Sequence, residues 1–158
     1  MKYENYEKMI IDRLQKCQEL DILACEIDSS VLSRQKSFKP SVYVLYQGSQ
    51  YEDPETLSMI AQMETMTFEI VIIARKLRGK SGIYAAFEII TKKLLGYREK
   101  GMRTPVIFQK FGYVSEMQGT YQYALQCSFT GYIVQSYDED AEKPLLIQKI
   151  TNNITDKE

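Results

Sequence analysis

Residues 121–130, YQYALQCSFT, alternate strictly between two sets of side chains. A β-strand turns successive side chains to opposite faces, so a period of two separates a covered face from an open one. The first set is Tyr121, Tyr123, Leu125, Cys127 and Phe129, and the second is Gln122, Ala124, Gln126, Ser128 and Thr130. The run therefore predicts a sheet with an apolar inner face and a polar outer face.

Two further long strands are predicted in the first half of the chain. Residues 41–51, SVYVLYQGSQY, are dominated by β-branched and aromatic side chains, which suit strands. Residues 65–77, TMTFEIVIIARKL, predict a second strand antiparallel to the first, with a helix-like stretch at residues 55–63 between them. Shorter strands are expected at residues 22–27 and 105–114.

Two segments show helical spacing. Residues 3–18 form an amphipathic pattern, and a second helix follows Ser81, with Ile83, Phe87, Ile90 and Leu94 along one stripe. We expect Ser81 to cap the start of this helix and Gly96 to end it as the C′ residue.

This order of elements, with short hairpin connections, predicts an α+β fold. The fold is a mainly antiparallel sheet of about five strands with two helices packed on one face. We expect residues 1–136 to form a single domain. Residues 137–158 are expected to be an acidic and polar C-terminal tail, in which residues 144–147 favour one short added strand.

Composition narrows the classes of function. The chain has no histidine, which removes Ser-His and Cys-His nucleophile pairs and the usual zinc sites. The net charge of −1 gives no general attraction to nucleic acid, and no apolar run reaches the ~18 residues that span a membrane. Cys17, Cys25 and Cys127 lie in apolar patterns and are expected to be small buried hydrophobes. We therefore expect no enzyme, no catalytic or metal-binding residue and no cofactor.

Gly79, Lys80 and Ser81 match the last three positions of a phosphate-binding P-loop. That loop needs a glycine five positions before Gly79, where this chain has Ala74, and bulky side chains fill the positions between. The triplet is therefore expected to turn the chain from a strand into a helix and to present positive charge at an edge.

Basic residues cluster around the predicted second helix. One set before it is Arg75, Lys76, Arg78 and Lys80, and another after it is Arg98, Lys100 and Arg103. Each set is either solvated loop charge or a contact for phosphates or acidic partner surfaces. Glu69 and Glu88 are the candidate paired carboxylates, but nothing in the sequence places them together.

Tyrosine is unusually frequent, with twelve residues and no tryptophan. Its apolar body and polar tip suit protein interfaces, although ordinary packing in a sheet accounts for the same count.

A family resemblance rests on four stretches: PSVYVLYQG at residues 40–48, MTFEIVIIAR at 66–75, GIY at 82–84 and LLGY at 94–97. With the N-terminal YEKMIIDRL, the chain resembles the tail-terminator proteins of Mu-like phages and prophages, akin to the lambda-type terminator fold. The resemblance covers about residues 3–135.

The resemblance implies a small structural subunit that forms a hexameric ring on the phage tail tube. Such a ring ends tube polymerisation and provides a surface for head joining. The implied partners are further copies of the chain, the tail tube protein and a head-completion or connector protein, with no specific nucleic acid and no membrane. The implied location is the virion tail, assembled in the cytoplasm of the bacterial host.

The interface residues we expect in such a ring are Tyr46, Tyr51, Arg75, Lys76, Arg78 and Lys80. Two other functions stay open on the residues alone. One is a non-enzymatic adaptor that acts as a monomer or dimer through its tyrosine-rich sheet. The other is an enzyme that uses carboxylates or lysines on phosphorylated substrates.

Overall fold

The computed structural model describes residues 1–23, 38–55 and 58–136. Within these ranges the chain forms one sheet and two helices, α1 (Lys2–Gln15) and α3 (Ile83–Leu94). The helices and strands follow one another in the predicted order, which confirms the α+β fold.

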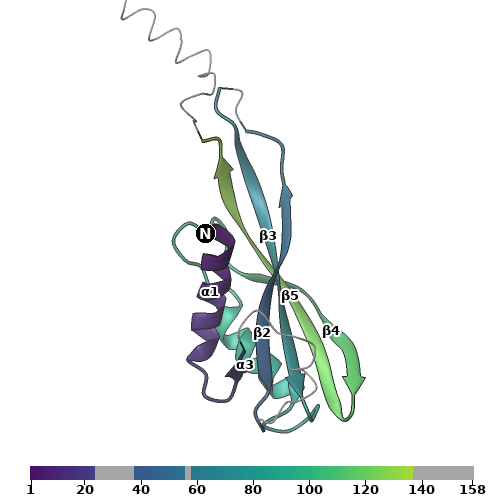
Figure 1. Cartoon of the computed structure of the whole chain (residues 1–158). Helices are drawn as coiled ribbons and strands as arrows, with labels where there is room; N and C mark the ends of the chain where they lie inside the picture. Colours follow the sequence, from purple (N-terminus) through teal and green to yellow (C-terminus); the bar gives the residue numbers. More distant parts are fainter. Residues whose placement is uncertain (24–37, 56–57, 137–158) are drawn as a thin grey trace, which may run out of the picture.

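The sheet has five strands in the spatial order β1-β2-β3-β5-β4 (Figure 1). Their bounds are β1 (Asp21–Ile22), β2 (Ser41–Tyr51), β3 (Ala61–Ala74), β4 (Ile107–Met117) and β5 (Thr120–Val134). Strand β1 pairs with β2 in parallel, and the other three neighbouring pairs are antiparallel. The sheet is therefore mainly antiparallel, as predicted, with β3 at its centre.

Both helices lie against the same face of the sheet (Figure 1). The alternation at residues 121–130 has the predicted result, since Leu125, Cys127 and Phe129 are buried on this face. Phe129 stacks on Phe68 of β3 with 5.3 Å between the ring centroids. The helices contribute to the same core the buried side chains Met9, Ile10, Leu14, Ile83, Ala86, Ile90 and Leu94.

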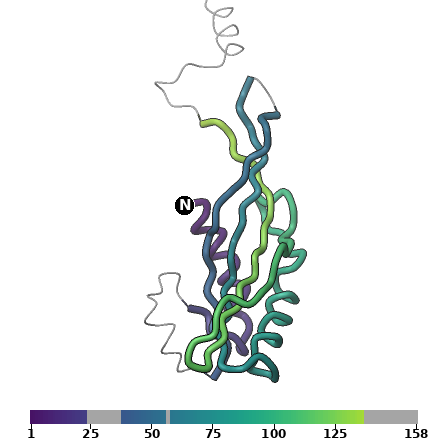
Figure 2. Tube along the Cα trace, turned by 90° about the vertical axis from the view of Figure 1, so that its right-hand side faces the viewer, coloured from purple at the N-terminus to yellow at the C-terminus, as the bar shows by residue number. Residues whose placement is uncertain are grey.

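The three central strands are longer than the layer of helices that covers them. Figures 1 and 2 show β2, β3 and β5 continuing past the N-terminal end of α1, while α3 lies beside their other half. We call the projecting part, residues 48–51, 61–65 and 130–134, the arm, and the helix-covered remainder of the described chain the body. Large apolar side chains of the arm are exposed, and Val134 keeps 51% of its surface accessible.

The helix-like stretch expected at residues 55–63 is wrong where the structure describes it. Residues 61–63 belong to β3 and residues 58–60 are not helical. Ala61 pairs with Val134 and Met63 with Tyr132, so pairing with a distant strand overrides the local helical pattern.

The expected caps of α3 are half right. Gly82, not Ser81, is the N-cap residue, and no side chain accepts a capping hydrogen bond from the backbone amides there. Gly96 follows the C-cap Leu95 with φ 79°, a left-handed conformation that glycine adopts without strain, so its role as the C′ residue is confirmed.

The strand predicted at residues 105–114 is confirmed as β4, whereas the strand predicted at residues 22–27 is confirmed only at Ile22. Ile22 ends β1, and the predicted strand residues 24–27 lie outside the described residues, as does Cys25. Cys17 and Cys127 are buried, and burial raises the pKa of the Cys127 thiol to about 12. These two thiols are therefore small apolar groups of the core.

Candidate interaction surfaces

Residues 75–82, which we call the basic turn, join the body end of β3 to α3. The side chains of Arg75, Lys76, Arg78 and Lys80 are all exposed. Gly82 lies so close to the preceding backbone that an added Cβ would come within 2.6 Å of the carbonyl oxygens of Leu77 and Arg78. The turn is therefore tightly folded, and its four charged residues are exposed.

The first amides of α3, which a phosphate site at a helix N-terminus would use, are already bonded to carbonyls of the basic turn. The Ile83 amide donates to the Lys76 carbonyl at 3.0 Å, and the Tyr84 amide donates to the Leu77 carbonyl at 3.1 Å. Amides that cradle a phosphate must point at the ligand instead. This geometry supports the sequence argument that Gly79, Lys80 and Ser81 form a connecting turn.

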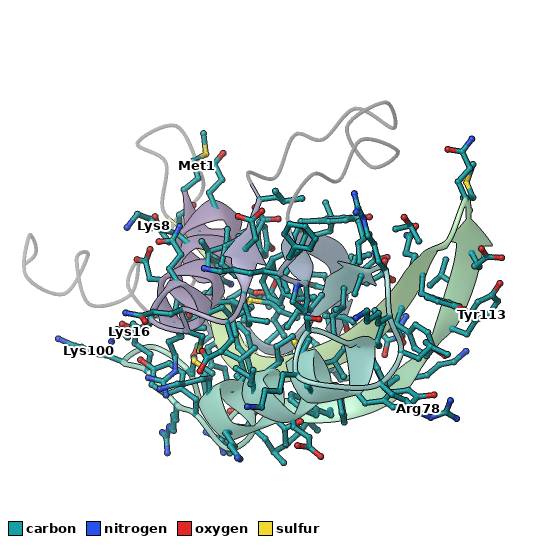
Figure 3. All side chains as sticks on the ribbon, turned by 90° about the horizontal axis from the view of Figure 1, so that it is seen from below. Met1, Lys8, Lys16, Arg78, Lys100 and Tyr113 are labelled. Carbon is teal, nitrogen blue, oxygen red and sulfur yellow. The ribbon has the colours of Figure 1, made fainter. Side chains whose placement is uncertain are left out.

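The second basic set lies at the other end of α3, about 18 Å away along a helix of 12 residues. Two of its side chains make internal contacts: the Arg98 Nε donates to the Met102 carbonyl at 3.0 Å, and Arg103 lies over the Tyr132 ring. Figure 3 shows Lys100 at one side of the molecule and Arg78 at the other. The two basic sets therefore form separate surfaces.

An open groove of about 680 Å³ runs between α1 and residues 97–100. Lys8, Lys16 and Lys100 lie along it (Figure 3), and Lys8 is paired with Asp12 at 2.9 Å. The Arg13 guanidinium lies 3.6 Å from the centroid of the Tyr97 ring and donates to the Lys93 carbonyl. Arg13 is thus held in the wall of the groove, and the exposed charge that remains comes mainly from lysines.

The two tyrosines predicted as interface residues meet at the root of the arm. Tyr46 stacks on Tyr3 of α1 with 4.3 Å between the centroids, and its hydroxyl is hydrogen-bonded to Ser49. The Tyr51 hydroxyl lies 3.3 Å from a carboxylate oxygen of Glu64. Tyr51 is half exposed, whereas Tyr46 is partly buried, so only Tyr51 presents much of its ring to a partner.

Glu64 is the centre of this cluster and was not predicted from the sequence. Its side chain is fully buried and forms an ion pair with Lys2. The Tyr3 hydroxyl donates to its Oε1 at 2.6 Å, and the Ser49 hydroxyl donates to the same oxygen at 2.7 Å. The carboxylate therefore ties the first turn of α1 to both strands of the β2–β3 hairpin.

The hydrogen bonds around Glu64 shift the pKa values of both Glu64 and Tyr3. Burial acts to raise the pKa of the Glu64 carboxyl, but hydrogen bonds from Lys2, Tyr3 and Ser49 outweigh it and hold that pKa below its usual value. The hydrogen bond to Glu64 raises the pKa of the Tyr3 phenol well above its ordinary value. Glu64 is therefore an ionised structural carboxylate at neutral pH.

A β-bulge explains how Tyr46, Ser49 and Tyr51 come to share one face. The β2–β3 register shifts between Tyr46 and Gly48, so one extra residue of β2 lies opposite β3. Before the bulge the even-numbered side chains of β2 face the helices, and after it the odd-numbered ones do. The regular alternation of β2 therefore continues only as far as Tyr46.

The six predicted interface residues fall into two groups. Tyr51 pairs with Glu64, and Ala74, the last residue of β3 before the basic turn, lies ten residues further along that strand. At ~3.3 Å per residue this separation is about 33 Å. One partner surface of ordinary size would have to be elongated to contact both groups.

A signal for Glu64 was present in the sequence. Positions 64, 66, 68, 70 and 72 share the inner face of β3, and Glu64 is the only charged residue among them. A carboxylate on a buried face requires a partner, and Lys2 is too distant in the sequence to be matched with it by spacing alone.

Glu69 and Glu88 do not form a pair. Glu69 lies on β3 at a position whose side chain faces away from the helices, and Glu88 lies on the exposed side of α3. Within the described ranges, no group of three or more cysteine or acidic residues is arranged to hold a metal ion. No helix in that part of the chain is long and apolar enough to cross a membrane.

The sheet and helices define a small α+β protein with its helices on one face and a projecting strand arm. Residues 10–153 match the family described as Gp37 protein, and the chain belongs to this family.

Comparison with curated proteins gave no match. Among solved structures, the chain is similar to a chain of the virion of a native gene transfer agent (GTA) particle. The two are 10% identical with a TM-score of 0.46, and the likeness covers 78% of this chain and 92% of that chain. At these values the likeness supports no inference about function.

Proposed function

We propose that this chain is a structural protein of phage virion assembly, a tail terminator that acts as a hexameric ring on the end of the tail tube. The ring would stop tube polymerisation and present a surface for head joining. Membership of the Gp37 family and the resemblance of residues 3–135 to Mu-like tail terminators support this function. The proposal assigns the chain no catalytic step.

The polarity of the molecule along β3 is the observation that carries the proposal. At the arm end, Glu52, Asp53 and Glu55 are exposed, and at the opposite end the basic turn presents its four cationic side chains. A ring placed between a tube and a head needs two different surfaces. A chain with one acidic end and one basic end provides them when its copies are arranged with the same orientation.

The proposed partners follow from this arrangement. They are further copies of the chain, the tail tube protein and a head-completion or connector protein, all within the virion tail. We further propose that residues 1–136 act as one domain in the ring, with residues 137–158 as a C-terminal extension.

The test is a tube-length assay with purified tail tube protein, combined with light scattering. We expect a particle of about 110 kDa, six copies of an 18.4 kDa chain, and tubes that stop growing once the chain is added. Tubes that elongate past saturating amounts of the chain would contradict the proposal. A strict monomer with no effect on tubes would favour the adaptor function instead.

The basic turn is tested in the same assay. Arg78→Glu together with Lys80→Glu reverses charge at two exposed side chains, so the fold should be unaffected while tube capping or head joining is lost. Lys110→Glu, at an exposed position on β4, is the matched control and should retain both activities. If the double variant keeps both activities, the basic turn is not a contact surface of the ring.

A further inference from the structure

The arm leaves two strand edges without a neighbour in the described part of the chain. Strand β1 pairs with β2 only at Ser41 and Val42, and β4 pairs with β5 only up to Ser128. Beyond these points β3 remains the central strand, with β2 on one side and β5 on the other. The arm is therefore a three-stranded ribbon with an edge on each side.

The body end of each edge is capped. On β2, the Tyr46 amide donates to the Glu7 carboxylate at 2.8 Å. On β5, the Thr130 amide donates to the Thr104 hydroxyl at 2.9 Å, and the Arg103 amide donates to the Thr130 carbonyl at 2.7 Å. Both caps stop where the arm begins.

Strand alternation identifies the backbone groups that point outward beyond the caps. On β5, the backbone amide and carbonyl of Thr130 point outward, and the Gln135 amide donates inward to the Ile60 carbonyl. The backbone groups of Tyr132 and Val134 therefore also point outward. On β2, the Glu52 amide donates inward to the Met63 carbonyl, so the backbone amides and carbonyls of Ser49 and Tyr51 point outward. Each edge thus offers two residues with outward amide and carbonyl groups.

The two edge segments themselves lack the features that usually protect an exposed strand, and in the described chain the nearby cation on the β5 side is Arg103, over the Tyr132 ring. Proteins blunt such edges with lysine, proline or inward-pointing charge. Residues 47–51 and 130–134 contain no lysine, arginine or proline. Tyr51, Tyr132, Ile133 and Val134 are instead exposed beside the open edges. An edge of this kind is suited to pairing with another strand.

We propose that the β5 edge of one copy pairs in parallel with the β2 edge of the next copy, with Tyr132 level with Gln50. This inference rests on the proposed ring. Since β2 and β5 both run toward the arm tip, copies related by rotation about an axis along the arms bring these two edges together in parallel. A second copy is the occupant because one chain supplies both edges.

The register is fixed by which groups point outward. With Tyr132 level with Gln50, the Tyr132 amide donates to the Ser49 carbonyl and the Tyr51 amide donates to the Tyr132 carbonyl. The side chains of Tyr132 and Gln50 then both face away from the helices, so the pleat continues across the contact. The Val134 amide reaches the Tyr51 carbonyl in the same way.

A ring is the arrangement that satisfies both edges in every copy. A two-fold dimer that pairs β5 with β5 leaves both β2 edges open. Six copies that each contribute three strands would close a sheet of about eighteen strands, and barrels of roughly 16–18 strands enclose an aqueous channel. The pairing would therefore produce an open lumen, as a ring on a tube requires.

Disulfide trapping tests the register. Gln50→Cys and Tyr132→Cys are introduced together with Cys25→Ser, and the buried Cys17 and Cys127 are left in place. Level residues on neighbouring strands lie within the Cα–Cα range of disulfides. Mild oxidation of the oligomer, free or on tail tubes, should give a ladder of covalent species that ends at the hexamer. Either cysteine substitution alone should give no covalent dimer.

The outcomes separate this inference from the proposed function. A hexamer by light scattering that gives no ladder overturns the edge pairing and leaves the ring intact. A covalent dimer from Tyr132→Cys alone indicates two-fold pairing and also overturns it. A chain that is monomeric both in solution and with tail tubes removes the ring itself, and the pairing with it.

A second variant removes one outward hydrogen bond without new cysteines. Val134→Pro deletes an amide that no described residue accepts, and proline is tolerated at such an edge position. We expect at least tenfold weaker association with an unchanged melting temperature of the monomer. Val134→Ala keeps the amide and is the matched control. Equal association of the proline and alanine variants would contradict the pairing.

Discussion

The body and the arm are built from the same three strands but differ in what covers them. In the body, β2, β3 and β5 bury one face under α1 and α3, and Phe68, Ile70 and Leu125 are fully buried. In the arm, beyond the contacts of Lys2 and Tyr3 with Glu64 at its root, the same strands continue without helices, and most of their large side chains are exposed. The difference indicates that folding free energy comes mainly from the body, while the arm is available for contacts with other molecules.

The largest expected effect is a cavity in the body. Phe68→Ala removes a fully buried ring that stacks on Phe129, and such changes cost ~3–5 kcal/mol. Phe38→Ala makes the same change at a side chain that is 87% exposed, so it should alter the free energy of unfolding by about 0.5 kcal/mol or less. Urea denaturation of both variants measures the difference. Equal losses would show that the body is not the main source of stability.

A smaller effect is expected where the body and the arm join. Glu64→Gln removes the buried charge that accepts hydrogen bonds from Tyr3 and Ser49 and pairs with Lys2, at a cost of about 1–3 kcal/mol. Glu52→Gln, at an exposed position beyond β2, is the control and should be close to neutral. Urea denaturation tests both, and a neutral Glu64→Gln would mean that the cluster does not tie α1 to the arm.

The same cluster predicts a pH dependence. Because the pKa of Glu64 is lower in the folded chain than its usual value of 4.5, its contribution is fully present above about pH 4.5. It is lost as the pH falls through the lower folded-state pKa, where the carboxylate takes up a proton. Thermal melting between pH 6 and pH 3 should therefore show a steeper loss for the wild-type chain than for Glu64→Gln. Parallel profiles would indicate that Glu64 does not titrate with folding.

The smallest effect on folding is expected in the arm. Ile133→Ala trims a side chain that is 39% exposed, so the free energy of unfolding should change by about 0.5 kcal/mol or less. If the arm joins copies, the same variant should weaken association measurably in sedimentation experiments. A large loss of monomer stability would show that the arm belongs to the folding core.

The parts of the fold predicted from sequence are those set by local periodicity. The alternation at residues 121–130, the apolar stripe of α3 and the position of Gly96 each depend on neighbours within a few residues. The errors have the opposite origin. Residues 61–63 join a strand because β5 pairs with them. The buried Glu64 pairs with Lys2, which lies 62 residues away in the sequence, so no local pattern reveals the contact.

In the candidate surfaces, too, local features were predicted from the sequence and features set by distant contacts were not. The sequence predicted that the basic turn connects a strand to a helix and exposes its charges, because the turn is local. It did not predict that Tyr46 and Tyr51 share a cluster, because an uninterrupted strand places an even-numbered and an odd-numbered residue on opposite faces and the bulge between Tyr46 and Gly48 brings them together. The open edges of the arm depend on where β1 and β4 stop pairing, which no single segment reveals.

The bulge also affects how related sequences can diverge. Gln47 is the extra residue, so deleting it would restore a regular ladder and leave the strand pairs on either side unchanged. Ser49 and Tyr51 would still face Glu64, because they would then continue the alternation that includes Tyr46. A homologue that lacks one residue here can therefore keep the same side chains on each face of the arm, and its gap should be aligned with Gln47.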